Sequence, residues 1–193
     1  MRAVNDLLAE IRAYDPYTAQ HGDRVARYAV AIGRGLGLPA DEVDEVRWAA
    51  LLHDIGKLWI PAPILQKPGP LDPRESQVMR GHAGFGAEIL RRRGFAGWGE
   101  LVEQHHERID GQGYPVGLPG RAIHLHARIV SVADVYDAMT TDRVYRRSLG
   151  YPAAEAELRR VAGTQLDADV VAAFLELRTR ERARRRRVAE ERP

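Results

Sequence analysis

The segment Leu52-His53-Asp54-Ile55-Gly56-Lys57 places an imidazole and a carboxylate side by side, directly after the apolar residues 48–52. An apolar run of this kind is expected to end a helix in the core, so both polar side chains start partly desolvated. Buried polar groups need partners, and a neighbouring imidazole and carboxylate are well suited to a metal ion. Taken alone, the pair more often marks a helix end in which both groups are only hydrogen-bonded.

Other imidazole and carboxylate groups recur in, or at the ends of, predicted helices. With His53 and Asp54 they form a set drawn from five segments of the chain: His21, His53, Asp54, His82, His105, His106 and Asp134. One ion takes four to six ligands, so this set suits two metal ions, with Asp54 as the natural bridge. Two divalent ions about 3.5–4 Å apart are a common device for cleaving a phosphoester. The spacing proves nothing alone, because the fold must bring the five segments together.

The composition limits the kind of protein. The 193 residues suit one domain with a real core, and the absence of cysteine excludes disulfides and thiolate metal sites. A net charge of +2 is too small to imply a nucleic-acid binder. Neither a membrane span of about 20 apolar residues nor a signal-peptide core is present, so we expect a soluble, cytoplasmic protein. The residues before position 15 are too few for a sensory domain, so we expect external control. The oligomeric state stays open.

The hydrophobic periodicity predicts an all-α protein, a single compact multi-helix domain around the candidate dimetal site. We expect an N-terminal helix or extension at 1–14, the domain itself at 15–177 and an arginine-rich C-terminal helix or tail at 178–193. Asp15-Pro16 and Asp72-Pro73 are typical helix starts, and one helix is expected to run from the second of these through Leu90. A turn is expected at 94–99. Later helices are predicted at 101–108, 129–139, 155–161 and 170–177.

Four longer motifs place these residues in a known pattern. They are Asp15-Pro16-Tyr17-Thr18-x-x-His21-x-x-Arg24-Val25, His53-Asp54-Ile55-Gly56-Lys57, His105-His106-Glu107-Arg108-x-Asp110-Gly111-x-Gly113-Tyr114-Pro115 and Val132-Ala133-Asp134-x-x-Asp137-Ala138. The sequence resembles the HD-GYP domain, a subgroup of the HD phosphohydrolase superfamily, over nearly all of its length. The third motif is highly specific, whereas the His-Asp pair alone is not.

The resemblance implies a helical fold and a metal-dependent phosphodiesterase that hydrolyses cyclic di-GMP. A metal-bridging hydroxide would attack phosphorus and give linear pGpG, with further cleavage to GMP left open. By position, one metal would be held by His21, His53, Asp54 and Asp134. The other would be held by Asp54, His82, His105 and His106. Members with three metals carry a glutamate where this chain has Tyr17, so we expect two, with iron or manganese favoured and zinc also compatible.

The resemblance also assigns residues that contact the substrate. Lys57 is one of only two lysines in the chain, the other cations being arginines. It matches the family lysine that steadies the scissile phosphate, so Asp54 and Lys57 are the expected catalytic pair. Arg143 and Arg146 match basic positions that hold the nucleotide phosphates, a role suited to the planar guanidinium.

The loop of the third motif has two interpretations. Glu107, Arg108 and Asp110 are expected to form a salt-bridged frame around it. The loop residues themselves are expected to be a shaped loop or a docking surface for a signalling partner such as a diguanylate cyclase domain: Asp110, Gly111, Gly113, Tyr114 and Pro115.

One departure from the family pattern concerns two further histidines. Where the family commonly has Ile-Pro-Leu-Gly, this chain has Ile123-His124-Leu125-His126. We expect His124 and His126 to be exposed loop residues rather than ligands. Val144 also replaces a proline, and Leu166-Asp167-Ala168 replaces Phe-Asp-Pro, but neither change removes a predicted ligand.

Two alternatives to cyclic di-GMP hydrolysis remain. The same site could act on another cyclic dinucleotide or on a nucleotide, or the chain could be a non-catalytic module that binds nucleotide or protein. Loss of ligands would favour the module, and all the predicted ligand positions are filled.

Overall fold

The computed structural model describes residues 2–142 and 147–190, and it confirms the all-α prediction within them. Arg143 and Arg146 lie outside the described residues. The elements, in chain order, are α1 (Arg2–Tyr14), α2 (Pro16–Gly35), α3 (Ala40–Leu52), the 3-10 helix η1 (Ile55–Trp59), α4 (Ala62–Leu65), α5 (Pro73–Arg80), α6 (His82–Arg92), α7 (Ala96–Gln104), the 3-10 helix η2 (Gly120–Ala122), α8 (Leu125–Thr140), α9 (Tyr151–Val161) and α10 (Ala168–Glu190).

The predicted helix starts have the expected chemistry. Asp15 caps α2 by accepting the backbone N–H groups of Tyr17 and Thr18, with Pro16 in the first turn. Asp72 and Glu75 form a reciprocal capping box at the start of α5. Such caps satisfy the donors that a helix start leaves without intrahelical partners.

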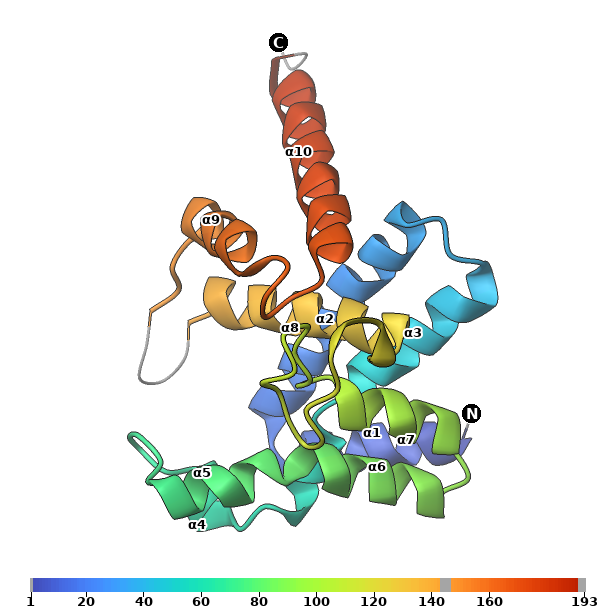
Figure 1. Cartoon of the computed structure of the whole chain (residues 1–193), viewed down its shortest axis with the longest axis vertical. Helices are drawn as coiled ribbons and strands as arrows, with labels where there is room; N and C mark the ends of the chain where they lie inside the picture. The colour runs from blue at the N-terminus through green and yellow to red at the C-terminus, as the bar shows by residue number, and fades with distance from the viewer. Residues whose placement is uncertain (1, 143–146, 191–193) are drawn as a thin grey trace.

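Two apolar clusters hold the helices together. The larger one joins α2, α3 and α8 to α9 and the first half of α10, and Tyr136 and Phe174 are its largest buried aromatic side chains. The smaller one joins α1, η1, α6 and α7, with Val4, Leu7 and Ile11 buried on one face of α1. Figure 1 shows α8 crossing the middle of the molecule, with α6 and α7 near α1 below it. The candidate ligands come from both clusters and from the segments between them.

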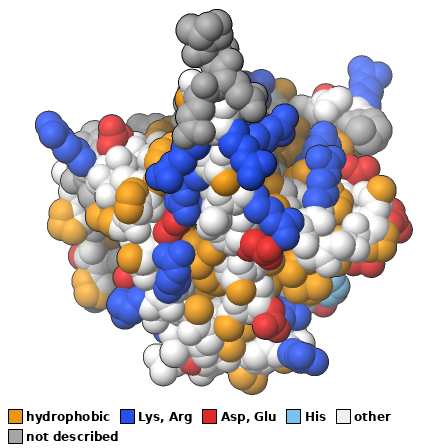
Figure 2. Space-filling model, turned by 90° about the horizontal axis from the view of Figure 1, so that it is seen from above, with side chains coloured by type: hydrophobic (Ala, Val, Ile, Leu, Met, Phe, Trp, Pro, Cys, Tyr) orange, Lys and Arg blue, Asp and Glu red, His pale blue; other side chains and the backbone are white. Residues whose placement is uncertain are grey.

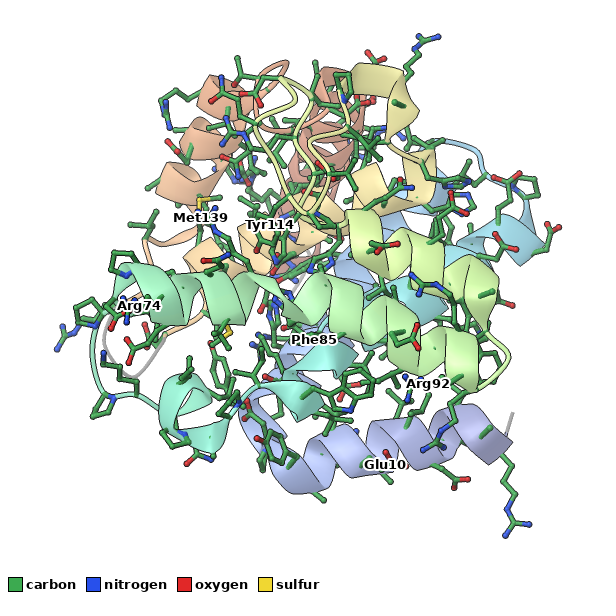
Figure 3. The ribbon with its side chains drawn as sticks, turned by 60° about the horizontal axis from the view of Figure 1, so that its bottom comes forward. Glu10, Arg74, Phe85, Arg92, Tyr114 and Met139 are labelled. Carbon is green, nitrogen blue, oxygen red and sulfur yellow. The ribbon has the colours of Figure 1, made fainter. Side chains whose placement is uncertain are left out.

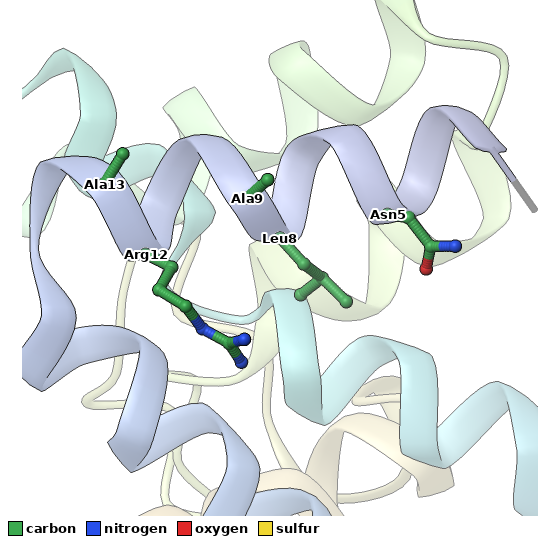
Figure 4. Close-up of a pocket in the computed structure, with 5 residues that line it drawn as sticks. All are labelled: Asn5, Leu8, Ala9, Arg12 and Ala13. Carbon is green, nitrogen blue, oxygen red and sulfur yellow. The ribbon is translucent and has the colours of Figure 1, made fainter.

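The outer surfaces are mostly polar. The opposite face of α1 bounds an open hollow lined by Asn5, Leu8, Ala9, Arg12 and Ala13 (Figure 4). α10 extends away from the body (Figure 1), and its basic side chains, all of them arginines, are seen around it when it is viewed end-on (Figure 2). Within the described part of the chain, no helix is both long and apolar enough to cross a bilayer.

Several local predictions were wrong. The helix expected at 101–108 ends at Gln104, so His105 and His106 follow it. The helix expected from 72 through 90 is interrupted at Gly81, which separates α5 from α6. The turn expected at 94–99 is shorter, because α7 begins at Ala96. Gly99 lies inside α7, where a Cβ atom would come within 3.0 Å of the Ala87 carbonyl oxygen of α6, so this glycine permits close helix packing rather than a turn.

The last correction concerns His124 and His126. α8 starts at Leu125, four residues earlier than expected, with His124 as its N-terminal cap. His124 is exposed, as predicted, but His126 lies in the first turn of the helix and is only 4% exposed. Its side chain is covered because it contacts Glu42 of α3, a tertiary contact that a local pattern does not reveal.

Candidate metal centre

The fold brings the predicted ligands together from five segments. His21 lies on α2, His53 and Asp54 directly follow α3, His82 begins α6, His105 and His106 follow α7, and Asp134 lies on α8. Two groups have ligand atoms within 4.8 Å of one another: His21, His53 and Asp54 in one, and His82, His105 and His106 in the other.

Asp54 lies between the two groups. Its Oδ1 atom is 3.4 Å from Nε2 of His82, in the second group. Its Oδ2 atom is 3.3 Å from Nε2 of His53 and 4.0 Å from Nε2 of His21, in the first group. One carboxylate oxygen therefore faces each group, which is the arrangement that a bridging ligand requires.

Three of the imidazoles are oriented by the same local device. The Nδ1 atom of each histidine lies within hydrogen-bond distance of the carbonyl oxygen three residues earlier: Ala50 at 2.7 Å for His53, Met79 at 2.7 Å for His82 and Val102 at 2.5 Å for His105. A carbonyl only accepts, so each Nδ1 carries the hydrogen and each Nε2 presents a lone pair. Hydrogen bonds of this kind, made by the ring nitrogen that does not bind the metal, fix the tautomer and the direction of metal-binding histidines.

The resulting lone pairs have no suitable protein partner. The Nε2 atom of His53 is buried and has no hydrogen bond to any residue that the structure describes. Those of His82 and His105 lie 3.3 Å apart, although neither carries a hydrogen to share in the tautomers that the carbonyls select. Facing lone pairs repel, and a cation between them removes the repulsion. The donor set therefore fits divalent metal ions that accept nitrogen and oxygen ligands.

His21 is held by carboxylates instead of a carbonyl. Its Nδ1 atom lies 2.7 Å from Oδ2 of Asp137, and its Nε2 atom lies 3.0 Å from Oδ1 of Asp134. Arg24 donates to both oxygens of Asp137, with Nε 2.8 Å from Oδ1 and Nη2 3.0 Å from Oδ2. This chain of contacts from Arg24 through Asp137 to His21 orients the ring toward Asp134 and Asp54. The ligand set predicted from the sequence did not include Asp137, although it lies one turn after Asp134 on the same helix.

The site's charges are strongly coupled. Burial opposes ionisation of Asp54, but Lys57 and His53 outweigh it and hold its pKa well below the usual range. Burial would also lower the pKa of His21, yet its hydrogen bonds to Asp134 and Asp137 raise it to about 9. Burial lowers the pKa of His82 and His105, and lowers that of His106 to about 3. The second group is therefore neutral, the form in which imidazole binds metals.

Comparison with known proteins assigns the family. The model of the HD domain matches residues 6–170. The chain belongs to the HD domain family. It is 44% identical over 181 residues to a cyclic di-GMP phosphodiesterase of Pseudomonas aeruginosa, covering 91% of this chain and 43% of that protein. It is 39% identical over 165 residues to the 3′3′-cGAMP-specific phosphodiesterase 3 of Vibrio cholerae, covering 85% of this chain and 36% of that protein. The chain thus spans less than half the length of these relatives.

A solved structure supports the fold. An HDG"Y"P protein from Bdellovibrio bacteriovorus aligns with a TM-score of 0.69 at 22% identity, over 86% of this chain and 53% of that one. Together with the motif at residues 105–115, these relatives confirm the predicted HD-GYP type of this HD domain.

The loop that follows the two adjacent histidines of the HD domain packs tightly on itself. Glu107 accepts the backbone N–H groups of residues 116–118, so it organises the loop through amides rather than through the expected salt bridge. Arg108 and Asp110 do form an ion pair, with Nη2 2.6 Å from Oδ2. At Gly113 a Cβ atom would lie 2.4 Å from the Arg108 nitrogen, so no side chain fits there.

Tyr114 connects this loop to the candidate metal centre. The centroid of its ring lies 4.8 Å from that of the His106 ring. The guanidinium carbon of Arg80, the last residue of α5, lies 5.3 Å from the centroid of the Tyr114 ring. Figure 3 shows Tyr114 reaching inward from the loop. Burial, followed by the charges of Asp134 and Asp54, raises the pKa of its hydroxyl, which therefore stays protonated as a hydrogen-bond donor at neutral pH.

Asp137 offers a test of the candidate metal centre that leaves the predicted ligands in place. We expect Asp137→Asn to weaken metal binding by about 10–100-fold, because partners that orient a ligating histidine typically contribute this much. Isothermal titration of metal-free protein with Mn²⁺ measures the effect. Asp142→Asn, at an exposed position five residues after Asp137, is the control. Equal affinity of Asp137→Asn and the unchanged protein would contradict this role.

Proposed function

We propose that this HD domain is a metal-dependent phosphodiesterase that hydrolyses a cyclic dinucleotide, with cyclic di-GMP as the preferred substrate and linear pGpG as the product. The observation that carries the proposal is Asp54, whose two oxygens face separate histidine groups while Lys57 Nζ lies 2.6 Å from Oδ2. A buried carboxylate between two sets of imidazoles suits a pair of divalent ions.

The predicted ligands divide between two ions in this proposal. One would be held by His21, His53, Asp54 and Asp134, and the other by Asp54, His82, His105 and His106. Two bound divalent ions would polarise the phosphoryl oxygens and lower the pKa of water. Iron or manganese is favoured and zinc is compatible, because the donors are nitrogen and oxygen only. Tyr17, one turn before His21, provides no carboxylate for a third ion.

The protein's own groups would position the substrate. Lys57 reaches from η1 to Asp54 and keeps 22% of its side chain exposed, so the ammonium group lies between the buried ligands and solvent. From there it can meet a phosphate oxygen next to the metals. Arg143 and Arg146 are proposed to hold the nucleotide phosphates on the basis of the family pattern. Both residues lie outside the described part of the chain.

Lys57 can be tested separately from the metals. We expect Lys57→Met to lower kcat by about 10²-fold while metal content stays unchanged, because the methionine keeps the stem and removes only the charge that stabilises the developing anion. Lys67→Met, which removes the only other lysine, is the matched control and should retain activity. A Lys57→Met protein with full activity would exclude the phosphate contact.

The relatives favour cyclic dinucleotides but divide between two of them. Proteins named for cyclic di-GMP and for 3′3′-cGAMP match at 44% and 39% identity. Because 3′3′-cGAMP has the same cyclic phosphodiester frame with one changed base, it is the second candidate substrate. The loop at residues 110–115 is also proposed as a docking surface for a signalling partner, since Val116 beside it is 71% exposed.

A direct assay tests the function. The protein is purified anaerobically, its metal content is measured, and it is incubated separately with cyclic di-GMP and 3′3′-cGAMP before the products are separated by chromatography. About two metals per chain and rapid formation of pGpG are expected. Faster turnover of 3′3′-cGAMP would select the second substrate. If the protein binds the nucleotide tightly but does not hydrolyse it with iron, manganese or zinc, the phosphodiesterase proposal is wrong. The chain would then be a non-catalytic binding module.

A further inference from the structure

A second group of histidine and carboxylate side chains lies away from the metal centre, at the first turns of α3 and α8. His126 begins α8, while Glu42 and Glu45 lie in the first two turns of α3. The metal centre uses residues that follow the other end of α3. Since His126 stands where the resembling family commonly has glycine, this second group is a property of this chain.

His126 has one satisfied and one unsatisfied nitrogen. Its Nε2 atom lies 3.0 Å from Oε2 of Glu42, so it donates its hydrogen to that carboxylate. The Nδ1 atom of the neutral ring then carries a lone pair. This atom is buried without a hydrogen-bond partner, and the residue is only 4% exposed. An unpaired buried acceptor is costly, so the Nδ1 atom requires a partner.

The atom facing that lone pair is a carboxylate oxygen. Oε2 of Glu45 lies 3.4 Å from Nδ1 of His126. Two acceptors cannot bond each other, but both can bind one cation. Ligand atoms about 2.0–2.1 Å from a tetrahedral zinc ion lie about 3.4 Å from each other, which matches the observed separation. Glu42 behind the ring completes the carboxylate–histidine–metal arrangement that orients many histidine ligands.

A hollow borders the same place. Glu45 lines this hollow of about 340 Å³ together with His124 and Glu100. The Nδ1 atom of His124 already accepts the backbone N–H of His126, so Nε2 of the neutral His124 ring carries the hydrogen and offers no lone pair. Phe95 and Trp98 form an aromatic wall there, their rings stacked with centroids 4.9 Å apart. The hollow opens on solvent beside Glu45, so an ion and its waters can reach this carboxylate.

We propose that His126 Nδ1 and Glu45 bind a divalent ion of the zinc type, with water completing the shell. The ion would join the start of α3 to the start of α8. The far end of α3 leads directly into His53 and Asp54, and α8 carries Asp134. The proposed ion would therefore hold together two helices that position the candidate metal centre, without taking part in its chemistry.

The test is a count of zinc ions. The metal-free 193-residue chain is titrated with Zn²⁺ by calorimetry, alongside its Glu45→Gln and His126→Gln variants. Each variant is expected to bind one Zn²⁺ fewer than the unchanged protein, or to bind that ion at least about tenfold more weakly. Asp44→Asn, exposed on the same helix, is the matched control and should bind as the unchanged protein does. The measured quantity is the difference in bound zinc between each variant and the unchanged protein. It does not depend on whether the proposed phosphodiesterase activity is present.

A second measurement separates a metal site from an ion pair. In protein labelled with ¹⁵N in its histidine rings, Zn²⁺ is expected to shift the Nδ1 resonance of His126 and leave that nitrogen without a hydrogen. Both ring nitrogens protonated and unmoved by Zn²⁺ would show an imidazolium paired with Glu42 and Glu45, and would overturn the proposal. So would a Glu45→Gln protein that binds zinc like the unchanged one. The side chain of Glu45 is 56% exposed, so the Glu45→Gln substitution should not disturb folding.

Discussion

Replacing Asp54 with alanine is expected to remove both metal ions and to lower kcat/KM by more than about 100-fold. Its oxygens face both histidine groups, at 3.3 Å from His53 and 3.4 Å from His82, so neither ion keeps a full ligand set without it. Outer partners of metal ligands already contribute about 10–100-fold, and a shared ligand should contribute more. Elemental analysis of the purified protein and the cyclic di-GMP assay measure the two effects.

The control for Asp54→Ala is Asp23→Ala, which removes an exposed carboxylate from α2. Among the described residues, Asp23 pairs only with the exposed Arg12 at 3.4 Å, an interaction of small energy at the surface. We expect normal metal content and normal activity in that variant. An Asp54→Ala protein that keeps two metals would refute the bridging assignment, even if its activity were lost. One that keeps a single metal would show that Asp54 belongs to one ion alone.

Much of the candidate site follows from residue types and their spacing. His53 and Asp54 follow an apolar helix end, and this local pattern identifies them as desolvated groups in need of partners. The specific motif at residues 105–115 then links them to His105 and His106. What the sequence could not supply is the convergence itself, since Asp134 meets His21 across 113 positions of the chain.

The partners of the ligands were harder to predict than the ligands. Asp137 is one turn after Asp134, but its role becomes visible only where Nδ1 of His21 and the guanidinium of Arg24 meet it. His126 was expected on an exposed loop, and it is buried because Glu42, 84 positions away, covers it. Both roles arise from contacts between helices that a local pattern does not encode.

Glycine shows the same limit in another form. The glycines at 94–99 favoured a turn on local grounds, yet Gly99 lies within a helix, where α6 and α7 approach closely. A missing Cβ atom serves both a turn and a close contact, and only the packing decides between them. The glycine of the His-Asp segment belongs to the second kind, and its substitution should have the largest effect on stability.

Replacing Gly56 with alanine is expected to lower the free energy of unfolding by about 3 kcal/mol or more. A Cβ atom there would lie 1.9 Å from the carbonyl oxygen of His82 and 2.4 Å from the nitrogen of Gly86. Both are backbone atoms of α6 and cannot rotate away, so the cost should reach or exceed the upper end for overpacking. For a chain of this size, the midpoint of thermal unfolding should fall by about 6–12 °C.

Gly84→Ala is the matched control for Gly56→Ala, because it adds the same methyl group within α6 where nothing lies within 4 Å. That substitution should be neutral or stabilise the helix by up to about 1 kcal/mol. Gly56→Ala should also weaken metal binding, since separating η1 from α6 moves His82 away from Asp54. Calorimetric unfolding of the two variants, each with and without Mn²⁺, measures both effects. Equal midpoints for the two variants would mean that η1 and α6 are not in contact as described, and the metal centre would then need a different geometry.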